Sequence, residues 1–144
     1  MGEEDRHYMR GTERKVITFR DWKIMPLICY DLRFPVWSRN DMAYDLLFYS
    51  SNWPAGRNDV WEVLLKARAI ENQSFVIGIN RVGTDGLSVS YIGNSQVISP
   101  KGNVIVSLSD EESFLYYELD LKELKEFRKK FPVLNDQDRF KIIV

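Results

Sequence analysis

The residue best suited to chemistry in this sequence of 144 residues is its single cysteine, Cys29. An apolar run over residues 23–28 precedes it and is typical of a buried strand, and a polar turn follows it. A thiol placed where a strand ends in an elbow lies at the edge of a sheet, within reach of a substrate. The alternative is an inert thiol, because free cysteine is among the most buried residue types. Spacing alone therefore makes Cys29 a candidate nucleophile and no more.

A nucleophilic thiol also needs a base that removes its proton and a group that stabilises the oxyanion. The only histidine, His7, lies in a charged N-terminal segment, where a histidine is more typical of a surface than of a catalytic pair. The sequence has no cysteine–histidine cluster with metal-ligand spacing and no glycine-rich phosphate loop. By elimination, a cysteine enzyme of this sequence would use a carboxylate base together with a lysine, and no metal.

Polar residues also follow two further apolar runs, at 45–50 and 75–80. In an α/β layer, ligands bind at the carboxyl ends of the strands. We therefore expect Asn52, Trp53 and Pro54 to lie beside Cys29 and to line a substrate pocket. Arg81 is a candidate for binding a substrate carboxylate, because a guanidinium can donate two parallel hydrogen bonds to it.

Several other polar residues are expected to serve the structure. Asp31 and Arg33 flank the elbow and would hold it through an ion pair or hydrogen bonds. The remaining ones would serve helix packing or shape a turn near a subunit interface; they are Arg68, Glu71, Asn72, Tyr91, Gly93 and Ser95.

Hydrophobic periodicity predicts strands that alternate with helices. The expected strands are residues 15–19, 23–28, 45–50, 75–80, 95–99, 103–108 and 113–118, and the expected helices are 34–40, 60–72 and 121–130. Strands that are apolar throughout and alternate with helices indicate an α/β layered fold, and the C-terminal hairpins make its sheet mixed.

Two of these helices carry boundary signals. Asn58 or Asp59 can cap helix 60–72, with Glu62 in the position of a capping-box acid. The core face of this helix would comprise Trp61, Leu64, Leu65 and Ala69. Asp120 can cap helix 121–130, and Pro132 follows its end.

The composition limits the classes of partner. A net charge of −1 without a basic block argues against nucleic acid as the main partner. No apolar run approaches the roughly 20 residues of a membrane span, and the charged residues 1–10 do not resemble a signal peptide. One cysteine cannot form an internal disulfide, so a cytoplasmic protein is expected.

The residues around the cysteine, Ile-Cys-Tyr-Asp-Leu-Arg-Phe-Pro at 28–35, resemble the nucleophile motif of the nitrilase superfamily of carbon–nitrogen hydrolases. Further matches follow in the order of the family. They are Asn52-Trp53-Pro54, Arg57, Trp61, residues 65–72, residues 80–83, Asp85-Gly86, Tyr91-Ile92-Gly93, Ser95 and Pro100-Lys101-Gly102. Residues 29–40 resemble the bacterial omega-amidase branch most closely.

The resemblance implies the C-terminal part of a four-layer α-β-β-α sandwich with mixed sheets, in a protein that forms a homodimer. Members of the family use a Glu-Lys-Cys triad and no cofactor. The glutamate is the general base, the cysteine forms a thioester as ammonia leaves, and water hydrolyses the acyl-enzyme. The implied substrate is a small linear omega-amide of a dicarboxylate, such as 2-oxoglutaramate.

By the same resemblance, Cys29 is the nucleophile and the N–H of Tyr30 is one donor to the oxyanion. A second family glutamate, which positions the lysine, falls at Glu4, or at Glu3 one residue earlier. The alternative for both glutamates is that they are solvated charges of a loop.

The general-base glutamate and the lysine of the family belong to a half that has no counterpart in these residues. Lys15 and Lys23 lie too near the cysteine in sequence to replace that lysine. We therefore expect residues 1–144 to be a carbon–nitrogen hydrolase domain without its N-terminal half. Half a sandwich would expose apolar strands, so self-association and a lack of amidase activity are expected of the chain alone.

Two alternatives stay open at this point. One is an amidase, carbamoyl-amine hydrolase or nitrilase of another branch. The other is a non-catalytic fragment that acts only in binding or dimerisation.

Overall fold

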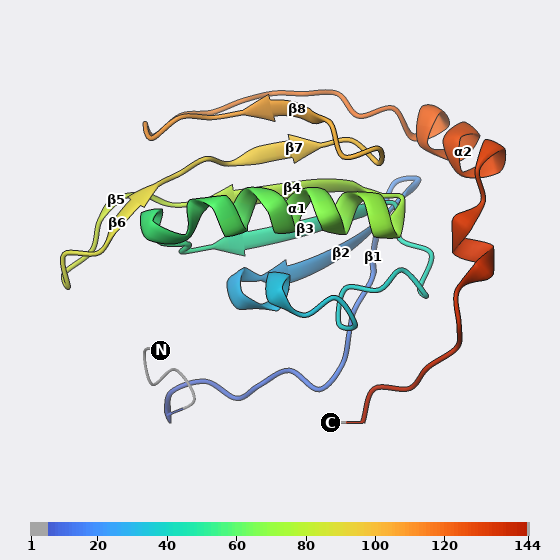
Figure 1. The fold of residues 1–144 in the computed structure, drawn as a ribbon, viewed down its shortest axis with the longest axis horizontal. Helices are drawn as coiled ribbons and strands as arrows, with labels where there is room; N and C mark the ends of the chain where they lie inside the picture. Colours follow the sequence, from blue (N-terminus) through green and yellow to red (C-terminus); the bar gives the residue numbers. More distant parts are fainter. Residues whose placement is uncertain (1–5, 144) are drawn as a thin grey trace.

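The computed structural model describes residues 6–143 and contains a six-stranded mixed sheet (Figure 1). Its strand order is β1-β2-β3-β4-β7-β8, in which β2, β3 and β4 run parallel and the other pairs are antiparallel. The expected α/β fold with a mixed sheet is confirmed. The strands are β1 (Ile17–Phe19), β2 (Trp22–Ile28), β3 (Leu46–Ser51), β4 (Phe75–Asn80), β7 (Gln96–Ile98) and β8 (Val104–Ser107).

One face of the sheet is covered by helix α1 (Asn58–Asn72), the crossover between the parallel strands β3 and β4 (Figure 1). Its buried residues Trp61, Leu65 and Ala69 recur every four positions, which places them on one side of a helix. They pack in the main hydrophobic core with alternate residues of the strands, such as Leu47. The expected core face of this helix is confirmed, with Leu64 partly buried at its margin.

The opposite face of the sheet is covered at one end only. Helix α2 (Leu121–Lys130) places Leu124 against Leu46 and Phe75. The side chain of Asp120 caps this helix as expected, because its Oδ1 accepts hydrogen bonds from the next backbone N–H groups at 2.7 and 3.1 Å. No helix among residues 6–143 has the length and apolar character that a membrane crossing needs.

Toward the carboxyl ends of the parallel strands, this second face is open. Ile28 at the end of β2 is 71% exposed, and Ile79 near the end of β4 is 48% exposed. A groove of ≈ 710 Å³ lies over the neighbouring part of the face, between β4, β7 and residues 108–117. Contiguous exposed apolar surface of this kind marks an interaction site or a tendency to aggregate.

A separate hairpin extends beyond β4. Strands β5 (Val82–Thr84) and β6 (Ser90–Ile92) pair antiparallel, and the chain reverses after Asp85. The hairpin between β7 and β8 is confirmed, and the Gly102 N–H closes its turn on the Ser99 carbonyl at 2.9 Å.

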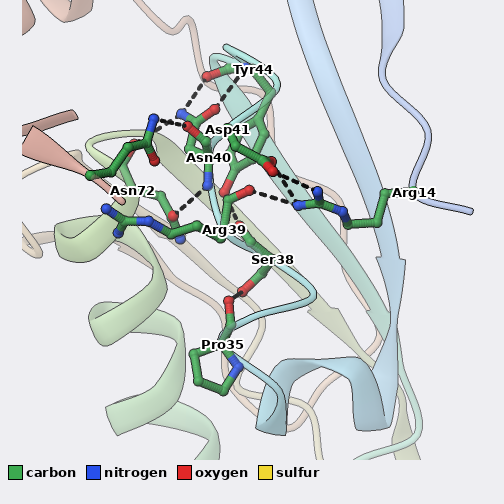
Figure 2. Close-up of polar contacts among 9 residues, drawn as sticks. Arg14, Pro35, Ser38, Arg39, Asn40, Asp41, Tyr44 and Asn72 are labelled. Carbon is green, nitrogen blue, oxygen red and sulfur yellow. Dashed lines mark hydrogen bonds and ion pairs between the residues drawn. The ribbon is translucent and has the colours of Figure 1, made fainter. Parts of the chain in front are cut away.

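The helix expected at residues 34–40 is wrong. The helical turn comes earlier, as the 3-10 helix η2 (Cys29–Arg33), and a loop follows it. Within this loop the Asn40 side chain donates to the carbonyls of Tyr44 and Asn72 and accepts from the Tyr44 N–H (Figure 2). Such bonds offer the backbone an alternative to helical hydrogen bonds.

Two further contacts hold the same loop. The Ser38 hydroxyl donates to the Pro35 carbonyl at 3.2 Å, and the Arg14 guanidinium forms two hydrogen bonds to the Asp41 carboxylate at 2.7 and 2.8 Å (Figure 2). The contacts to Arg14 and Asn72 come from residues distant in sequence, which local periodicity does not reveal.

The strand expected at residues 113–118 is also wrong, because these residues have no regular structure. Phe114 and Tyr116 are 92% and 95% exposed. The sequence has the composition of a strand, but a strand requires a partner, and none of the described strands pairs with this segment.

The capping box expected at α1 is wrong as well. Arg57 occupies the N-cap without a side-chain hydrogen bond, and the 3-10 helix η3 (Ala55–Arg57) leads directly into α1. The side chain of Asn58 does not cap α1, because it donates to Glu62 at 2.9 Å and its Oδ1 accepts from Asn94 at 2.8 Å.

Candidate active site

The carboxyl ends of the three parallel strands meet at one edge of the sheet. Ile28 of β2 pairs with Ser50 of β3, and Ser51 of β3 pairs with Asn80 of β4. The residues that follow these strands therefore lie along the same edge, which is the ligand-binding edge of open α/β sheets. The candidates Cys29, Asn52-Trp53-Pro54 and Arg81 all follow these strand ends.

Cys29 lies at the sharp elbow between β2 and η2. Its φ angle is +38°, in the left-handed region that residues other than glycine seldom adopt, at a cost of roughly 1–2 kcal/mol. The side chain is half-buried and packs against the main core. Backbone strain maintained at a nucleophilic residue is a pointer to function.

The elbow is held from both ends. The Asp31 carboxylate accepts a hydrogen bond from the Ile28 N–H at 2.9 Å, which closes the turn around Cys29. The buried Arg68 of α1 donates to the Leu32 carbonyl at 2.7 Å and pairs with Glu71 at 2.9 Å. These contacts confirm that Asp31 and the helix residues have structural roles.

The N–H of Tyr30, the expected oxyanion donor, lies in the first turn of η2. N–H groups in the first turn of a helix have no partner within that helix. Near it, the guanidinium of Arg33 lies 5.9 Å from the Tyr30 ring centroid and 5.1 Å from that of Trp53. No ion pair joins Asp31 to Arg33 in the described part of the chain, so the hydrogen-bond alternative holds for Asp31.

Trp53 is fixed firmly beside this edge. It is 3% exposed, its ring packs 5.6 Å from that of Trp61, and its Nε1–H donates to the Arg57 carbonyl at 2.8 Å. Its two neighbours are less enclosed, since Asn52 is exposed and Pro54 is half-buried.

Asn80, which the sequence reading did not single out, orders the backbone here. Its Oδ1 accepts from the Trp53 N–H at 2.6 Å, and its Nδ2 donates to the carbonyls of Trp53 and Gly93 at 3.0 and 2.8 Å. The Asn80 N–H itself donates to the Ser95 hydroxyl at 2.9 Å. Two signals in the sequence could have found it: Asn80 is a polar side chain that closes an otherwise apolar strand, and it belongs to the family match at residues 80–83.

Arg81 opens the β5–β6 hairpin and lies over the ring of Tyr91, with 4.6 Å from its guanidinium carbon to the ring centroid. The Tyr91 hydroxyl donates to Asp85 at 2.9 Å. This hydrogen bond is the largest cause that raises the pKa of Tyr91.

The remaining candidates are not placed next to the thiol. Glu4 and its alternative Glu3 lie outside the described residues, and His7 is exposed. Within residues 6–143, nothing forms a hydrogen bond with the Cys29 thiol. In the same range there is also no group of three or more His, Cys, Asp or Glu side chains that could hold a metal.

A half-buried thiol on a strained strand-to-helix elbow lies at the carboxyl edge of parallel strands, as in the class of α/β proteins that carry their reactive side chain on such an elbow. Residues 3–129 match the model of the carbon-nitrogen hydrolase family, and the chain belongs to that family.

Named relatives agree with this membership. The omega-amidase YafV of Escherichia coli K12 is 48% identical over 143 residues, which are 99% of this chain and 56% of the relative. The 2-oxoglutaramate amidase of Bacillus subtilis is 38% identical over 136 residues, 93% of this chain and 52% of the relative. The chain thus spans a little over half the length of these relatives.

The fold also matches a solved structure. XC1258 from Xanthomonas campestris, a CN-hydrolase superfamily protein with an arsenic adduct in its active site, superposes with a TM-score of 0.94 at 40% identity. The match covers 98% of this chain and 56% of that one. The fold is therefore that of the nitrilase superfamily.

Proposed function

We propose that this chain carries the nucleophile of an omega-amidase, which hydrolyses a small linear omega-amide such as 2-oxoglutaramate to an acid and ammonia. The observation that carries this proposal is the placement of Cys29 on a strained elbow at the carboxyl edge of β2. The amidase names of the relatives in Escherichia coli and Bacillus subtilis support the substrate class.

In the proposed reaction, the Cys29 thiolate attacks the amide carbon, and the carbonyl oxygen becomes an oxyanion. The N–H of Tyr30 is the proposed donor to this oxyanion, since it has no partner within η2. Collapse of the tetrahedral intermediate breaks the C–N bond, and ammonia leaves with the added proton. Water then attacks the thioester, the acid leaves, and the thiol is restored.

The pocket proposed for the acyl part is lined by Asn52, Trp53 and Pro54. Trp53 supports this role best, because its backbone and ring are both fixed at the edge that carries Cys29. The guanidinium of Arg81 is proposed to bind the substrate carboxylate.

A base and a lysine are still required, because the thiol has no hydrogen-bond partner among residues 6–143. We propose that Glu4 positions the lysine, and that residues 1–144 are a carbon–nitrogen hydrolase domain whose base and lysine come from an N-terminal half. On this proposal the chain alone is inactive. The intact protein is proposed to be a cytoplasmic homodimer that requires no cofactor.

The test is ammonia release from 2-oxoglutaramate. The chain is assayed alone and after mixing with the N-terminal part of the Escherichia coli relative, the part that precedes its match to this chain. Activity of the mixture that disappears with Cys29→Ser supports the proposal. A mixture that forms a stable complex but releases no ammonia overturns it, and favours a fragment that acts only in binding or dimerisation.

A further inference from the structure

The guanidinium of Arg81 is available to a ligand. Its side chain is exposed, and its contact is the stacked ring of Tyr91, at 4.6 Å. Among residues 6–143, the guanidinium N–H groups of Arg81 form no hydrogen bond or ion pair. Stacking on a ring face leaves the edge of a guanidinium free, and that edge is the part that binds a carboxylate through two hydrogen bonds.

The ring that carries Arg81 is itself held in place. The Tyr91 hydroxyl donates to Oδ2 of Asp85 at 2.9 Å. The other oxygen of Asp85 accepts from the N–H groups of Leu87 and Val89 at 2.9 and 3.0 Å. The carboxylate is therefore anchored to the backbone of its own turn, and it fixes the far end of the tyrosine ring.

Arg81, Tyr91 and Asp85 together form one unit, and the charge of Asp85 also favours the observed position of Arg81 in it. Asp85 carries a full negative charge close to the guanidinium, and the positive charge of Arg81 is one of the causes that lower the pKa of Asp85. The two groups nevertheless form no ion pair within 4 Å in the described chain. The charge of Asp85 therefore attracts the guanidinium to the hairpin, but the guanidinium can still donate its hydrogen bonds to a ligand.

Arg81, with Tyr91 and Asp85 beside it, lies at the same edge of the sheet as the candidate nucleophile. Arg81 directly follows β4, at the sheet edge where Cys29 follows β2. Only β3 separates β2 from β4 in the sheet, and neighbouring strands lie about 4.8 Å apart. A second anionic group of a substrate bound at Cys29 can therefore lie near the guanidinium.

We propose that Tyr91 and Asp85 are positioning residues that hold Arg81 as the carboxylate receptor of this site. The unit makes the enzyme selective for amides that carry an anionic group at the end opposite the scissile amide. This inference rests on the proposed function, because it takes Cys29 as the attacking group.

The test uses Cys29 as a reporter and requires no catalysis. Cys29 is the only thiol of the chain, so labelling of the intact protein reports on this site alone. Rates of labelling are measured with 3-maleimidopropionate, which is anionic, and with N-ethylmaleimide, which is neutral. The rate with the anionic reagent is divided by the rate with the neutral one, and this ratio is divided by the same ratio for free glutathione. The resulting normalised ratio does not depend on the thiol pKa or on the general accessibility of the thiol.

We expect this normalised ratio to exceed one in the unaltered chain, and Arg81→Gln to lower it about threefold to tenfold, as expected for the loss of one nearby charge. Tyr91→Phe keeps the ring but loses the bond to Asp85, so it should lower the ratio by a smaller factor. Arg20→Gln is the matched control, because Arg20 also stacks on an aromatic ring but precedes β2, at the opposite edge. It should leave the ratio unchanged.

Other results overturn the inference. A normalised ratio of one in the folded, unaltered chain excludes an anion receptor near Cys29. A ratio that falls with Arg33→Gln and not with Arg81→Gln assigns the role to Arg33, which stacks on Trp53. A ratio unaffected by Tyr91→Phe rejects the positioning role.

A second measurement needs no variant and therefore tests the inference even if the variants fail to fold. In the unaltered chain, 0.5 M salt should reduce the ratio toward one, because screening weakens an exposed charge, and a salt-independent ratio overturns the inference. The labelling ratio is independent of ammonia release. The proposed function can therefore fail while the receptor is retained, and the reverse can also occur.

Discussion

The carboxamide of Asn80 forms two hydrogen bonds with the backbone of Trp53. Its Oδ1 accepts from the Trp53 N–H at 2.6 Å, and its Nδ2 donates to the Trp53 carbonyl at 3.0 Å. Asn80 closes β4, and Trp53 follows the end of β3. One side chain thus fixes the path of the chain beside the candidate nucleophile. A third bond to the Gly93 carbonyl, at 2.8 Å, ties the β5–β6 hairpin to the same point.

Replacing this side chain is expected to be costly. Asn80→Ala leaves a buried N–H and two carbonyls without their partner, and each unsatisfied buried group costs about 1–3 kcal/mol. We expect the free energy of unfolding in urea to fall by about 2–4 kcal/mol. Asn135→Ala is the control, because Asn135 is exposed, and its effect should stay within about 0.5 kcal/mol. Equal effects of the two variants would contradict this role.

Gly78 allows α1 to approach the sheet closely. A Cβ at this position would lie 2.7 Å from Cζ2 of Trp61 and 2.7 Å from Cδ1 of Leu65. Gly78→Ala should therefore lower the thermal midpoint, at a cost of about 1–3 kcal/mol for overpacking. Gly56→Ala is the matched control, since nothing lies within 4 Å of a Cβ there, and no loss is expected. A Gly78→Ala variant as stable as the control would show that the helix can shift freely.

The Asp85 carboxyl should make the hairpin sensitive to acid. The Val89 N–H is the largest cause that lowers its pKa below 3.8, followed by the Leu87 N–H, the Tyr91 hydroxyl and the charge of Arg81. A lowered folded-state pKa means that the unfolded chain binds the proton more readily. The stabilisation is therefore complete above the unfolded pKa and is lost as the pH falls through the folded one.

Amide hydrogen exchange in the hairpin measures this dependence. We expect protection of the β5–β6 amides to fall as the pH drops below 3.8, relative to the exchange of an unstructured reference peptide. Asp85→Asn should remove the pH dependence, whereas Asp138→Asn, which changes an exposed carboxylate elsewhere, should retain it. Protection that is constant over this range would contradict the hydrogen-bonded role of the carboxylate.

The open face of the sheet should drive self-association. Ile79 is 48% exposed on this face, near Ile28, which is 71% exposed. Ile79→Lys should shift sedimentation of the chain toward the monomer, because a charge at the centre of an apolar contact is not easily buried. Val63→Lys is the control, since Val63 is 64% exposed on α1, which covers the other face. A monomeric unaltered chain at high concentration would refute the expectation.

Much of the architecture follows from the sequence alone. The apolar runs at 45–50 and 75–80 became β3 and β4, and Asp120 became the cap of α2, because burial pattern and capping are local properties. The motif around Cys29 indicated an elbow at a sheet edge and membership of the carbon-nitrogen hydrolase family, and both are confirmed.

Only the tertiary structure decided the rest, because those features depend on partners far away in the sequence. Residues 34–40 lack a helix since Asn40 binds Asn72, 32 positions along the chain. Residues 113–118 have strand composition, but no described strand pairs with them. The hydrogen bonds between Asn80 and Trp53 join residues 27 positions apart, and a contact at that separation produces no local pattern in the sequence.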